Sequence, residues 1–341
     1  MAEAKRRRIG VIGAGWVADY HLPAWMKQSA RAEVVAIADP SRDARAAKSN
    51  AFGISRSYES AEAMLAAETL DAVDICAPRE VHMALVRLAA EKGIDILCQK
   101  PLATDYDQAV GLVAGLPSSI QLMVHENWRF RAYYRRLKAW LEEGIAGDIR
   151  QVQFEFFSSG MIADAQGNRP ALIRQPFFRR QQRLLVMEVM IHHLDTLRYL
   201  LGEMEVIAAR LERSNDEIVA EDVAAVVLRR LDDGVIVTVN ANLAVHGEPP
   251  APHDHLRIFG THATLELDGS RLSAKGHVQR VEEFEPDAVY QGAYDATIAH
   301  FLDGLDGRVA METVPDDNLK TLALVEDIYR LSRFDPECKP R

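Results

Sequence analysis

Short apolar runs alternate with amphipathic segments along the first 125 residues of the chain. The runs are apolar throughout, which is typical of strands buried on both faces of a parallel sheet. They are IGVIG, VVAIAD, AVDICA, IDILC and IQLMV. Between two of them, VHMALVRLAAEKG places Val81, Leu85, Leu88 and Ala89 on one helical face, and Gly93 marks a stop. This alternation of strands and helices predicts a doubly wound parallel sheet.

The pattern changes after about residue 150, where strands dominate. The predicted strands are QVQFEFF, EVIAARLE, VAAVVLRRL, VIVTVNANL, LRIFG and TLELD. Their alternation of apolar and polar positions, with the turn DDG at 232–234, favours a largely antiparallel sheet. Long helices are expected near 185–201 and 290–305, and a last one over about 316–332, where Pro315 and Asp316 form a start signal.

The length and net charge of the chain indicate how many domains it has and which partners it does not bind. A chain of 341 residues favours two domains, since single cores rarely grow past about 250–300 residues. The formal net charge of −10 argues against nucleic acid or an anionic membrane as a partner. No apolar run approaches the roughly 18 residues of a membrane span. The basic run at 5–8 abuts a strand and is interpreted as a solvated flank.

The chain contains three cysteines, Cys76, Cys98 and Cys338, without the spacing of a metal site. A sparse and odd number of cysteines is typical of a reducing compartment, so we expect a cytoplasmic protein. Cys76 and Cys98 fall in apolar strands and are expected to be unreactive core residues.

A glycine-rich stretch, GVIGAGWVADYH, follows the first predicted strand. Gly13, Gly15 and Ala18 fit the pattern G-x-G-x-x-G/A, which combines a tight turn, a close approach of phosphate and close packing of helix on strand. An acid, Asp39, ends the second strand and can accept both ribose hydroxyls. The pattern therefore predicts a dinucleotide site that prefers NAD to NADP, although Arg42 offers a cation for a 2′-phosphate.

Two further motifs extend the picture: QKPLA at 99–103 and MEVMIHHLDTLRYLLGE at 187–203. With the glycine-rich start, they make the chain resemble the Gfo/Idh/MocA oxidoreductase family along essentially its whole length. The resemblance implies an NAD(P)-binding Rossmann domain, expected at 1–125. It also implies a substrate-binding and oligomerisation domain, expected at 126–341, whose last helix is a candidate to pack back on the first domain. In that family this second domain has an open, mostly antiparallel sheet whose outer face is often buried in an oligomer, so the resemblance implies a homodimer or homotetramer.

The resemblance implies that Lys100 lies beside the nicotinamide and the reacting carbinol. A lysine amine there can take or share the alcohol proton, and its charge polarises the forming carbonyl oxygen. Pro101 stands where the family often has a cis peptide bond. Gln99 replaces the usual glutamate of the family's E-K-P, which removes a negative charge beside the lysine.

The second motif carries Glu188, His192 and Asp195, whose spacings of four and three place them on one helical face. The resemblance implies that His192 is a general acid–base, that Asp195 binds substrate hydroxyls and that Glu188 orients His192 or the sugar. Glu188 departs from the family's aspartate by one methylene group. The alternative interpretation is that these three residues form a polar helical face that only meets solvent. A metal site at His192 and His193 is a weaker alternative, because adjacent residues point to different sides of a helix.

Further contacts follow from the resemblance. Residues expected to line the cofactor are Trp16, Val17, Ala77, Pro78, His82 and Gln99; Arg79 stands where asparagine is common. Residues expected to offer hydrogen bonds and an aromatic wall to a sugar are Glu126, Asn127, Trp128 and Arg129. For each of these four, packing between the domains is an equal alternative.

A basic segment at 168–183 precedes the second motif and contains Arg169, Arg174, Arg179, Arg180 and Arg183. These arginines can receive the carboxylate of an acidic sugar. A solvated basic loop or an oligomer contact explains them equally well.

The leading interpretation is an NAD-dependent dehydrogenase that acts on a secondary alcohol of a sugar, cyclitol or sugar acid, with no metal. One alternative on the same fold is an NAD-dependent glycosidase that oxidises and re-reduces a sugar carbon. Another is a non-catalytic NAD(H) sensor, against which Lys100 and His192 argue because a sensor needs no proton carrier.

Overall fold

The structure, a computed structural model, describes residues 6–251 and 253–336. The chain forms two compact units. The first consists of the described part of Met1–Phe130 together with Tyr290–Lys320, and the second of Arg131–Val289 with the described part of Thr321–Arg341. The units differ from the predicted domains because the chain returns to the first unit over 290–320. The predicted boundary at 125/126 stays a prediction.

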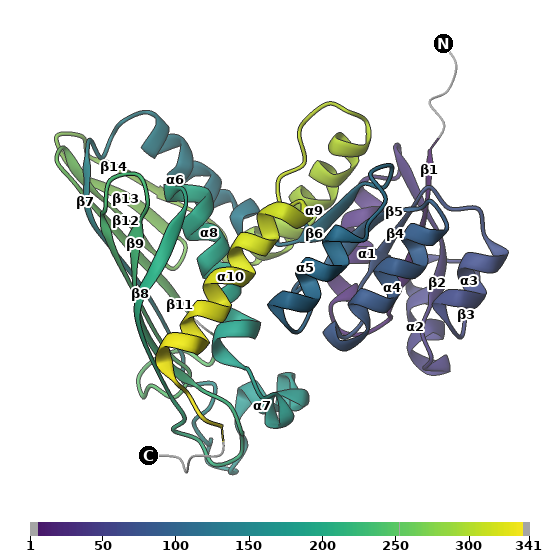
Figure 1. Cartoon of the computed structure of the whole chain (residues 1–341), viewed down its shortest axis with the longest axis horizontal. Helices are drawn as coiled ribbons and strands as arrows, with labels where there is room; N and C mark the ends of the chain where they lie inside the picture. Colours follow the sequence, from purple (N-terminus) through teal and green to yellow (C-terminus); the bar gives the residue numbers. More distant parts are fainter. Residues whose placement is uncertain (1–5, 252, 337–341) are drawn as a thin grey trace. The chain divides into compact units, whose positions relative to one another are not determined.

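The first unit contains a sheet of six parallel strands in the order β3-β2-β1-β4-β5-β6 (Figure 1). The strands are β1 (Arg7–Ile12), β2 (Ala32–Ala38), β3 (Arg56–Tyr58), β4 (Ala72–Ile75), β5 (Asp95–Gln99) and β6 (Leu122–His125). The five predicted apolar runs are β1, β2, β4, β5 and β6. The doubly wound parallel sheet is thereby confirmed, and β3 was missed because it has only three residues, none of them buried.

Helices cover both faces of this sheet, with one apolar cluster on each face. They are α1 (Ala18–Lys27), α2 (Arg42–Phe52), α3 (Ala61–Ala67), α4 (His82–Glu91), α5 (Tyr106–Ala114), the short turns η1 (Arg79–Val81) and η2 (Trp128–Phe130), and most of α9 (Pro286–Leu305). The predicted face of α4 is partly wrong. Val81 precedes the helix and is exposed, whereas Val86 and Ala89 are buried. Gly93 ends the segment with a positive φ of 72°, as expected.

Helix α9 belongs to the first unit because it packs against α1. Tyr294 stacks on Tyr20 with ring centroids 5.1 Å apart, and Phe301 meets Trp25 edge-on. The helix therefore completes the apolar cluster on one face of the parallel sheet. Sequence periodicity predicted the helix but not the sheet on which it packs.

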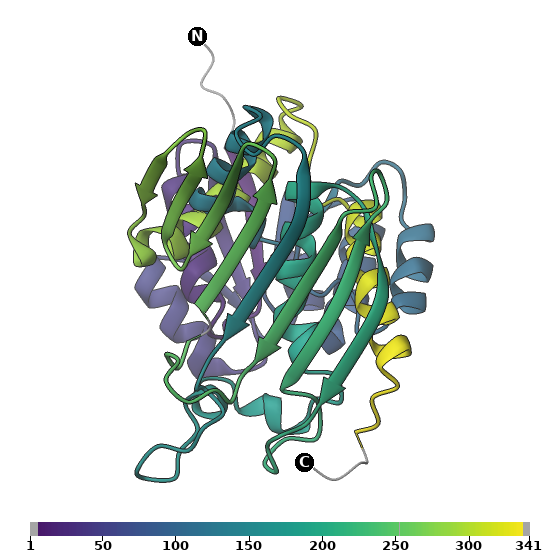
Figure 2. The same ribbon diagram turned by 90° about the vertical axis from the view of Figure 1, so that its left-hand side faces the viewer.

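The second unit is built on an eight-stranded sheet in the order β14-β13-β12-β11-β7-β10-β9-β8 (Figure 2). Its strands are β7 (Ile149–Phe157), β8 (Met204–Glu212), β9 (Val223–Arg230), β10 (Ile236–Asn242), β11 (His253–Gly260), β12 (Ala263–Asp268), β13 (Arg271–Gly276) and β14 (Arg280–Glu283). All neighbours are antiparallel except β7 and β10. The largely antiparallel sheet is confirmed, and the short strands β13 and β14 were not predicted.

The helical elements of this unit are α6 (Ala132–Glu142), α7 (Pro170–Arg174), η3 (Pro176–Arg180), a π-helical turn η4 (Leu185–Met190), α8 (Ile191–Leu201) and the later part of α10 (Pro315–Ser332). Alternate residues of the central strands, such as Phe154 and Leu228, are fully buried. The residues between them stay exposed or half-exposed, which leaves the sheet one open face.

Two expectations from the sequence concern the cysteines and membrane-spanning segments. Cys76 and Cys98 are buried free thiols, and burial raises the pKa of each well above its usual value, so both are protonated. Cys338 lies outside the described residues. Among the helices that the structure describes, none is long and apolar enough to cross a membrane.

Gly13 fixes the turn between β1 and α1. Its φ is +105°, and a Cβ there would lie 2.6 Å from the carbonyl carbon and oxygen of Cys76, the residue that follows β4. Gly15, two residues on, faces no atom within 4 Å of the equivalent position. The backbone therefore requires glycine at 13 but tolerates a side chain at 15.

Gly13→Ala is expected to lower the free energy of unfolding by about 1–3 kcal/mol, because backbone strain and a clash with backbone atoms act together. Gly15→Ala, the matched control, is expected to change it by less than about 0.5 kcal/mol. Urea unfolding of both variants measures the difference. Equal stability of the two would contradict the geometry.

Candidate active site

The carboxyl ends of β1 and β2 bring the glycine-rich loop and Asp39 together. Asp39 Oδ2 accepts the Ala14 N–H at 2.7 Å, and Asp39 Oδ1 accepts the Ser41 N–H at 2.7 Å. The carboxylate thus joins the glycine-rich loop to the start of α2, with lone pairs remaining on each oxygen. Arg42 begins α2 nearby in sequence and is exposed.

Four other residues that were predicted to line the cofactor lie in this loop or just after β4. Trp16 is 46% exposed, and Val17 is half-buried immediately before α1. Ala77 and Pro78 follow β4, at the same edge of the sheet as Gly13. This edge carries the carboxyl ends of all the parallel strands, the usual ligand-binding edge of such a sheet.

His82 connects the ends of β4 and β5. Its Nδ1 lies 2.8 Å from the carbonyl oxygen of Pro101, and its Nε2 lies 2.8 Å from that of Ala77. Carbonyl oxygens only accept, so each contact is a hydrogen bond when the facing ring nitrogen carries a proton. The ring thereby ties the turn after β4 to the segment after Lys100, whose peptide bond to Pro101 is cis, as anticipated.

A buried network of hydrogen bonds includes Gln99, and Gln99 is its only member that the sequence predicted as a site residue. Asp74 Oδ2 accepts hydrogen bonds from His21 Nδ1, at 2.8 Å, and from Trp25 Nε1, at 2.7 Å. The amide Nε2 of Gln99 lies 2.6 Å from His21 Nε2 and 3.2 Å from His125 Nδ1. The two amide protons of Gln99 match the two ring nitrogens, which explains how a neutral residue fits where the family has glutamate.

The same region contains the only group of three possible metal ligands found among the described residues: His21, Asp74 and Cys76. Asp74 Oδ2 is already engaged by His21 and by Trp25, and burial keeps the Cys76 thiol protonated. These contacts favour a hydrogen-bonded core over a metal site.

The segment after β6 holds the four residues that were predicted to contact a sugar. Glu126, Asn127 and Arg129 are buried, and Trp128 is half-buried. Arg129 Nη2 pairs with Asp317 at 3.0 Å. Packing within the first unit accounts for this contact of Arg129, and the substrate role of the four residues stays a prediction.

In the second unit, η4 and α8 carry the predicted catalytic motif. Glu188 and His192 are half-buried, whereas Asp195 is fully buried. The Thr321 hydroxyl lies 3.3 Å from Asp195 Oδ1 and accepts a bond from Arg198 Nη1 at 2.7 Å. Asp195 thus takes part in holding α8 against α10, while its role toward a substrate stays a prediction.

His193 points away into the core of the second unit. Its ring stacks on Phe156 with centroids 4.1 Å apart, and its Nε2 lies 2.9 Å from Asp254 Oδ1. Its Nδ1 lies 3.2 Å from the Val189 carbonyl oxygen. These contacts anchor α8 to β11 and separate the role of His193 from that of His192.

Asp254 is the centre of this anchor. The Tyr134 hydroxyl donates to its Oδ2 at 2.8 Å, and Arg131 Nη1 lies 3.3 Å from the same oxygen. Burial alone would raise the pKa of Asp254, but His193, Arg131 and Tyr134 outweigh it and lower that pKa. The carboxylate therefore stays ionised, and Asp254 was not identified from the sequence because its partners are up to 123 residues away.

The basic segment at 168–183 is largely paired with acids. Arg169 contacts Glu217 at 2.9 Å, Arg179 contacts the same carboxylate at 3.1 Å, and Arg183 pairs with Glu326 at 2.7 Å. These pairs favour the structural alternative for the three arginines. Arg174 and Arg180 are exposed.

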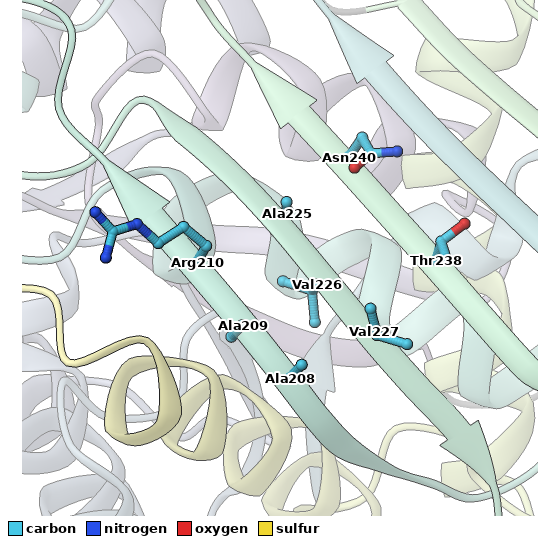
Figure 3. A pocket seen from close by; sticks show the side chains of 8 residues that line it. All are labelled: Ala208, Ala209, Arg210, Ala225, Val226, Val227, Thr238 and Asn240. Carbon is cyan, nitrogen blue, oxygen red and sulfur yellow. The ribbon is translucent and has the colours of Figure 1, made fainter. Parts of the chain in front are cut away.

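A shallow depression lies on the open face of the second sheet, over β8, β9 and β10 (Figure 3). Its lining residues are Ala208, Ala209, Arg210, Ala225, Val226, Val227, Thr238 and Asn240. None of the predicted catalytic or cofactor residues belongs to it.

Comparison with known proteins supports the family. Residues 7–124 match the model of an oxidoreductase family with an NAD-binding Rossmann fold, and residues 134–266 match the GFO/IDH/MocA C-terminal domain. A D-apiose dehydrogenase from Paraburkholderia graminis is 32% identical, covering 96% of this chain and 88% of that protein. An inositol 2-dehydrogenase from Rhizobium meliloti is 23% identical, covering 95% and 96%.

A similar solved structure is that of an oxidoreductase from Agrobacterium radiobacter in complex with NAD+, L-tartaric acid and magnesium. It is 31% identical, covers 96% of this chain and 97% of its own, and superposes with a TM-score of 0.88. The family models match both halves of the sequence, and the fold matches that structure over nearly the whole chain. This chain therefore belongs to the Gfo/Idh/MocA family of NAD-binding oxidoreductases.

Proposed function

We propose that this chain is an NAD-dependent dehydrogenase that transfers a hydride between nicotinamide and a secondary alcohol of a sugar. The observation that carries the proposal is that a chain of this NAD-binding family retains two proton carriers, Lys100 after β5 and His192 on α8. The identity of 32% to proteins named D-apiose dehydrogenase supports a sugar as the substrate class.

The N-terminus of α1, Gly15 and Asp39 would hold NAD. The open space at Gly15 suits the pyrophosphate, which the N-terminal N–H groups of α1 attract. Asp39 offers its remaining lone pairs to the ribose hydroxyls and repels a 2′-phosphate. Bound NAD supplies the hydride acceptor.

Lys100 and His192 would manage the proton. When a hydride leaves the carbinol carbon, the hydroxyl proton must go to a base, and an amine or imidazole serves. The charge of a protonated Lys100 also stabilises the negative charge that develops on the oxygen. Glu188 would orient His192 or a sugar hydroxyl, and Asp195 would bind a hydroxyl.

Within this class we propose an unphosphorylated aldose, such as D-apiose, ahead of a cyclitol. The relatives named D-apiose dehydrogenase are 32% identical, compared with 23% for the inositol 2-dehydrogenase. The pairing of Arg169, Arg179 and Arg183 with acids argues against a phosphate or carboxylate receptor there. Sugar acids remain the next class to test, since the Agrobacterium structure holds L-tartaric acid.

Lys100→Ala is expected to lower kcat by about 10²–10⁴-fold, because the proton carrier at the reacting oxygen is lost. NADH formation at 340 nm with D-apiose, other aldoses, cyclitols and sugar acids measures the effect, and His192→Asn is expected to behave alike. Lys92→Ala, which alters an exposed lysine after α4, is the control and should retain wild-type activity. Tight NAD binding without turnover on any substrate would instead favour the glycosidase or the sensor.

Asp39→Asn is expected to weaken NAD binding by about tenfold and to raise the ratio of NADP to NAD affinity, because the charge that repels a 2′-phosphate is gone. Asp43→Asn, at an exposed acid in the first turn of α2, is the control. Fluorescence titration with both cofactors measures the change. An unchanged ratio would contradict the role of Asp39.

We further propose a cytoplasmic homo-oligomer that buries the open face of the eight-stranded sheet. Ala208, Ala225 and Ile207 are exposed on β8 and β9, an apolar area that a second copy would cover. Ala225→Arg places a charge there and is expected to reduce the mass measured by light scattering to that of one 38.0 kDa chain. Lys92→Ala, at an exposed lysine of the first unit, should leave the mass unchanged.

A further inference from the structure

Glu221 is a fully buried acid two residues before β9, and the proposed chemistry does not use it. Its Oε1 accepts the N–H of Val186 at 3.0 Å, the N–H of Leu184 at 3.3 Å and the Tyr329 hydroxyl at 2.5 Å. Its Oε2 has no hydrogen-bond partner among the described residues. One oxygen thus takes three donors, while the other lies in the core.

The two N–H groups belong to the start of η4, where a helix leaves its first donors without partners inside the helix. No side chain of the segment itself caps this end. Glu221 therefore acts as a cap supplied by a residue more than 30 positions away, and its negative charge suits the positive end of the helix dipole.

This end of the helix is directly linked to the candidate catalytic groups. The N–H of Glu188 donates to the carbonyl oxygen of Leu184 at 2.7 Å, and His192 follows one turn later in the continuous segment η4–α8. A π-helical turn is rare and is frequently found at functional sites. A shift at Leu184 and Val186 would therefore move Glu188 and His192 with it.

The charges near Glu221 come from three elements. Burial raises the pKa of Glu221, although Tyr329 and the N–H groups partly offset this. Arg183 lies over the Tyr329 ring, 4.6 Å from its centroid, but pairs with Glu326. The neighbouring acid Asp222 bonds Ser214 instead. Among the described residues Glu221 has no ion-pair partner, so only hydrogen bonds compensate its charge.

We propose that Glu221 is a positioning residue, whose carboxyl group fixes the first turn of the segment that carries Glu188 and His192 and so sets their alignment for the reaction. The inference rests on the proposed function of these two residues. A buried acid without a cation costs stability compared with an apolar side chain of similar volume. Glu221 Oε1 accepts all of the side chain's hydrogen bonds, from the helix start and from α10, which indicates what that cost maintains.

The test compares Glu221→Gln, which keeps an acceptor oxygen, with Glu221→Leu, which keeps bulk without an acceptor. Glu221→Leu is expected to lower kcat/KM for the sugar by about 10-fold to 10²-fold, as small misplacements of catalytic groups do. Glu221→Gln is expected to retain kcat/KM within about threefold because its amide oxygen can replace the cap. NAD affinity should stay unchanged in both, since Glu221 belongs to the second unit.

Asp222→Asn is the matched control, a neighbouring buried acid that bonds Ser214 and not the helix. It should leave kcat/KM unchanged. The proposal is overturned if Glu221→Leu keeps wild-type kcat/KM, or if Glu221→Gln loses as much as Glu221→Leu.

Hydrogen exchange separates this inference from the proposed function. In Glu221→Leu the amides of Leu184 and Val186 should exchange faster than in wild type, whereas Asp222→Asn should leave them unchanged. This readout needs no turnover, so it decides the positioning claim even if no sugar is oxidised. If Glu221→Leu does not fold, Glu221→Met, which also lacks an acceptor oxygen for these N–H groups, replaces it, and unchanged exchange at both amides overturns the proposal.

The pH dependence of stability gives a further check. Because the pKa of Glu221 is raised in the folded state, the folded protein holds a proton that the unfolded chain releases above about pH 4.5. The contribution of Glu221 to the free energy of unfolding must therefore fall as pH rises from about 4.5 through the folded pKa. Glu221→Gln removes this contribution, so its Tm relative to wild type should increase with pH over that window; a constant difference would contradict the buried ionisable carboxyl.

Discussion

A carboxylate that is buried must find hydrogen-bond donors, and both units are organised around this requirement. In the first unit Asp74, on the central strand β4, draws His21 and Trp25 of α1 onto the sheet. In the second unit Asp254 on β11 holds α8 through His193 and α6 through Tyr134. The helices that bear the candidate chemistry are thus fixed by polar contacts that permit one arrangement, whereas apolar packing alone tolerates several.

Sequence patterns predicted the architecture where burial is uniform. The strands β1, β2, β4, β5 and β6 are continuous apolar runs, and β7, β9 and β10 alternate cleanly, so both sheets could be predicted. β14 could not, because its four residues are exposed or half-exposed and pair only with β13 at an edge. Val81 was assigned to a buried face because periodicity cannot locate where a short turn ends and a helix begins.

In the candidate site, too, only some of the residues could be predicted from the sequence. Motifs indicated Lys100, His192 and Asp39, since each stands at a characteristic place relative to a strand or helix. The residues that hold them were not predicted. His193 and Asp254 are 61 positions apart, and Glu221 meets Tyr329 across 108 positions, so nothing local in the sequence links the partners. A charged residue inside an apolar strand, as Asp74 is in AVDI, is the one local signal that could have been used.

The return of the chain to the first unit has a consequence for biosynthesis. The polypeptide passes from one unit to the other after residues 130, 289 and 320, so the second unit is largely an insertion within the first. A ribosome releases the whole parallel sheet early, yet Trp25 and Leu22 lack the covering side chains of α9, including Phe301, until some 170 further residues have been translated. The nascent Rossmann sheet must therefore persist with an uncovered apolar face, a stage at which chaperone engagement would protect it.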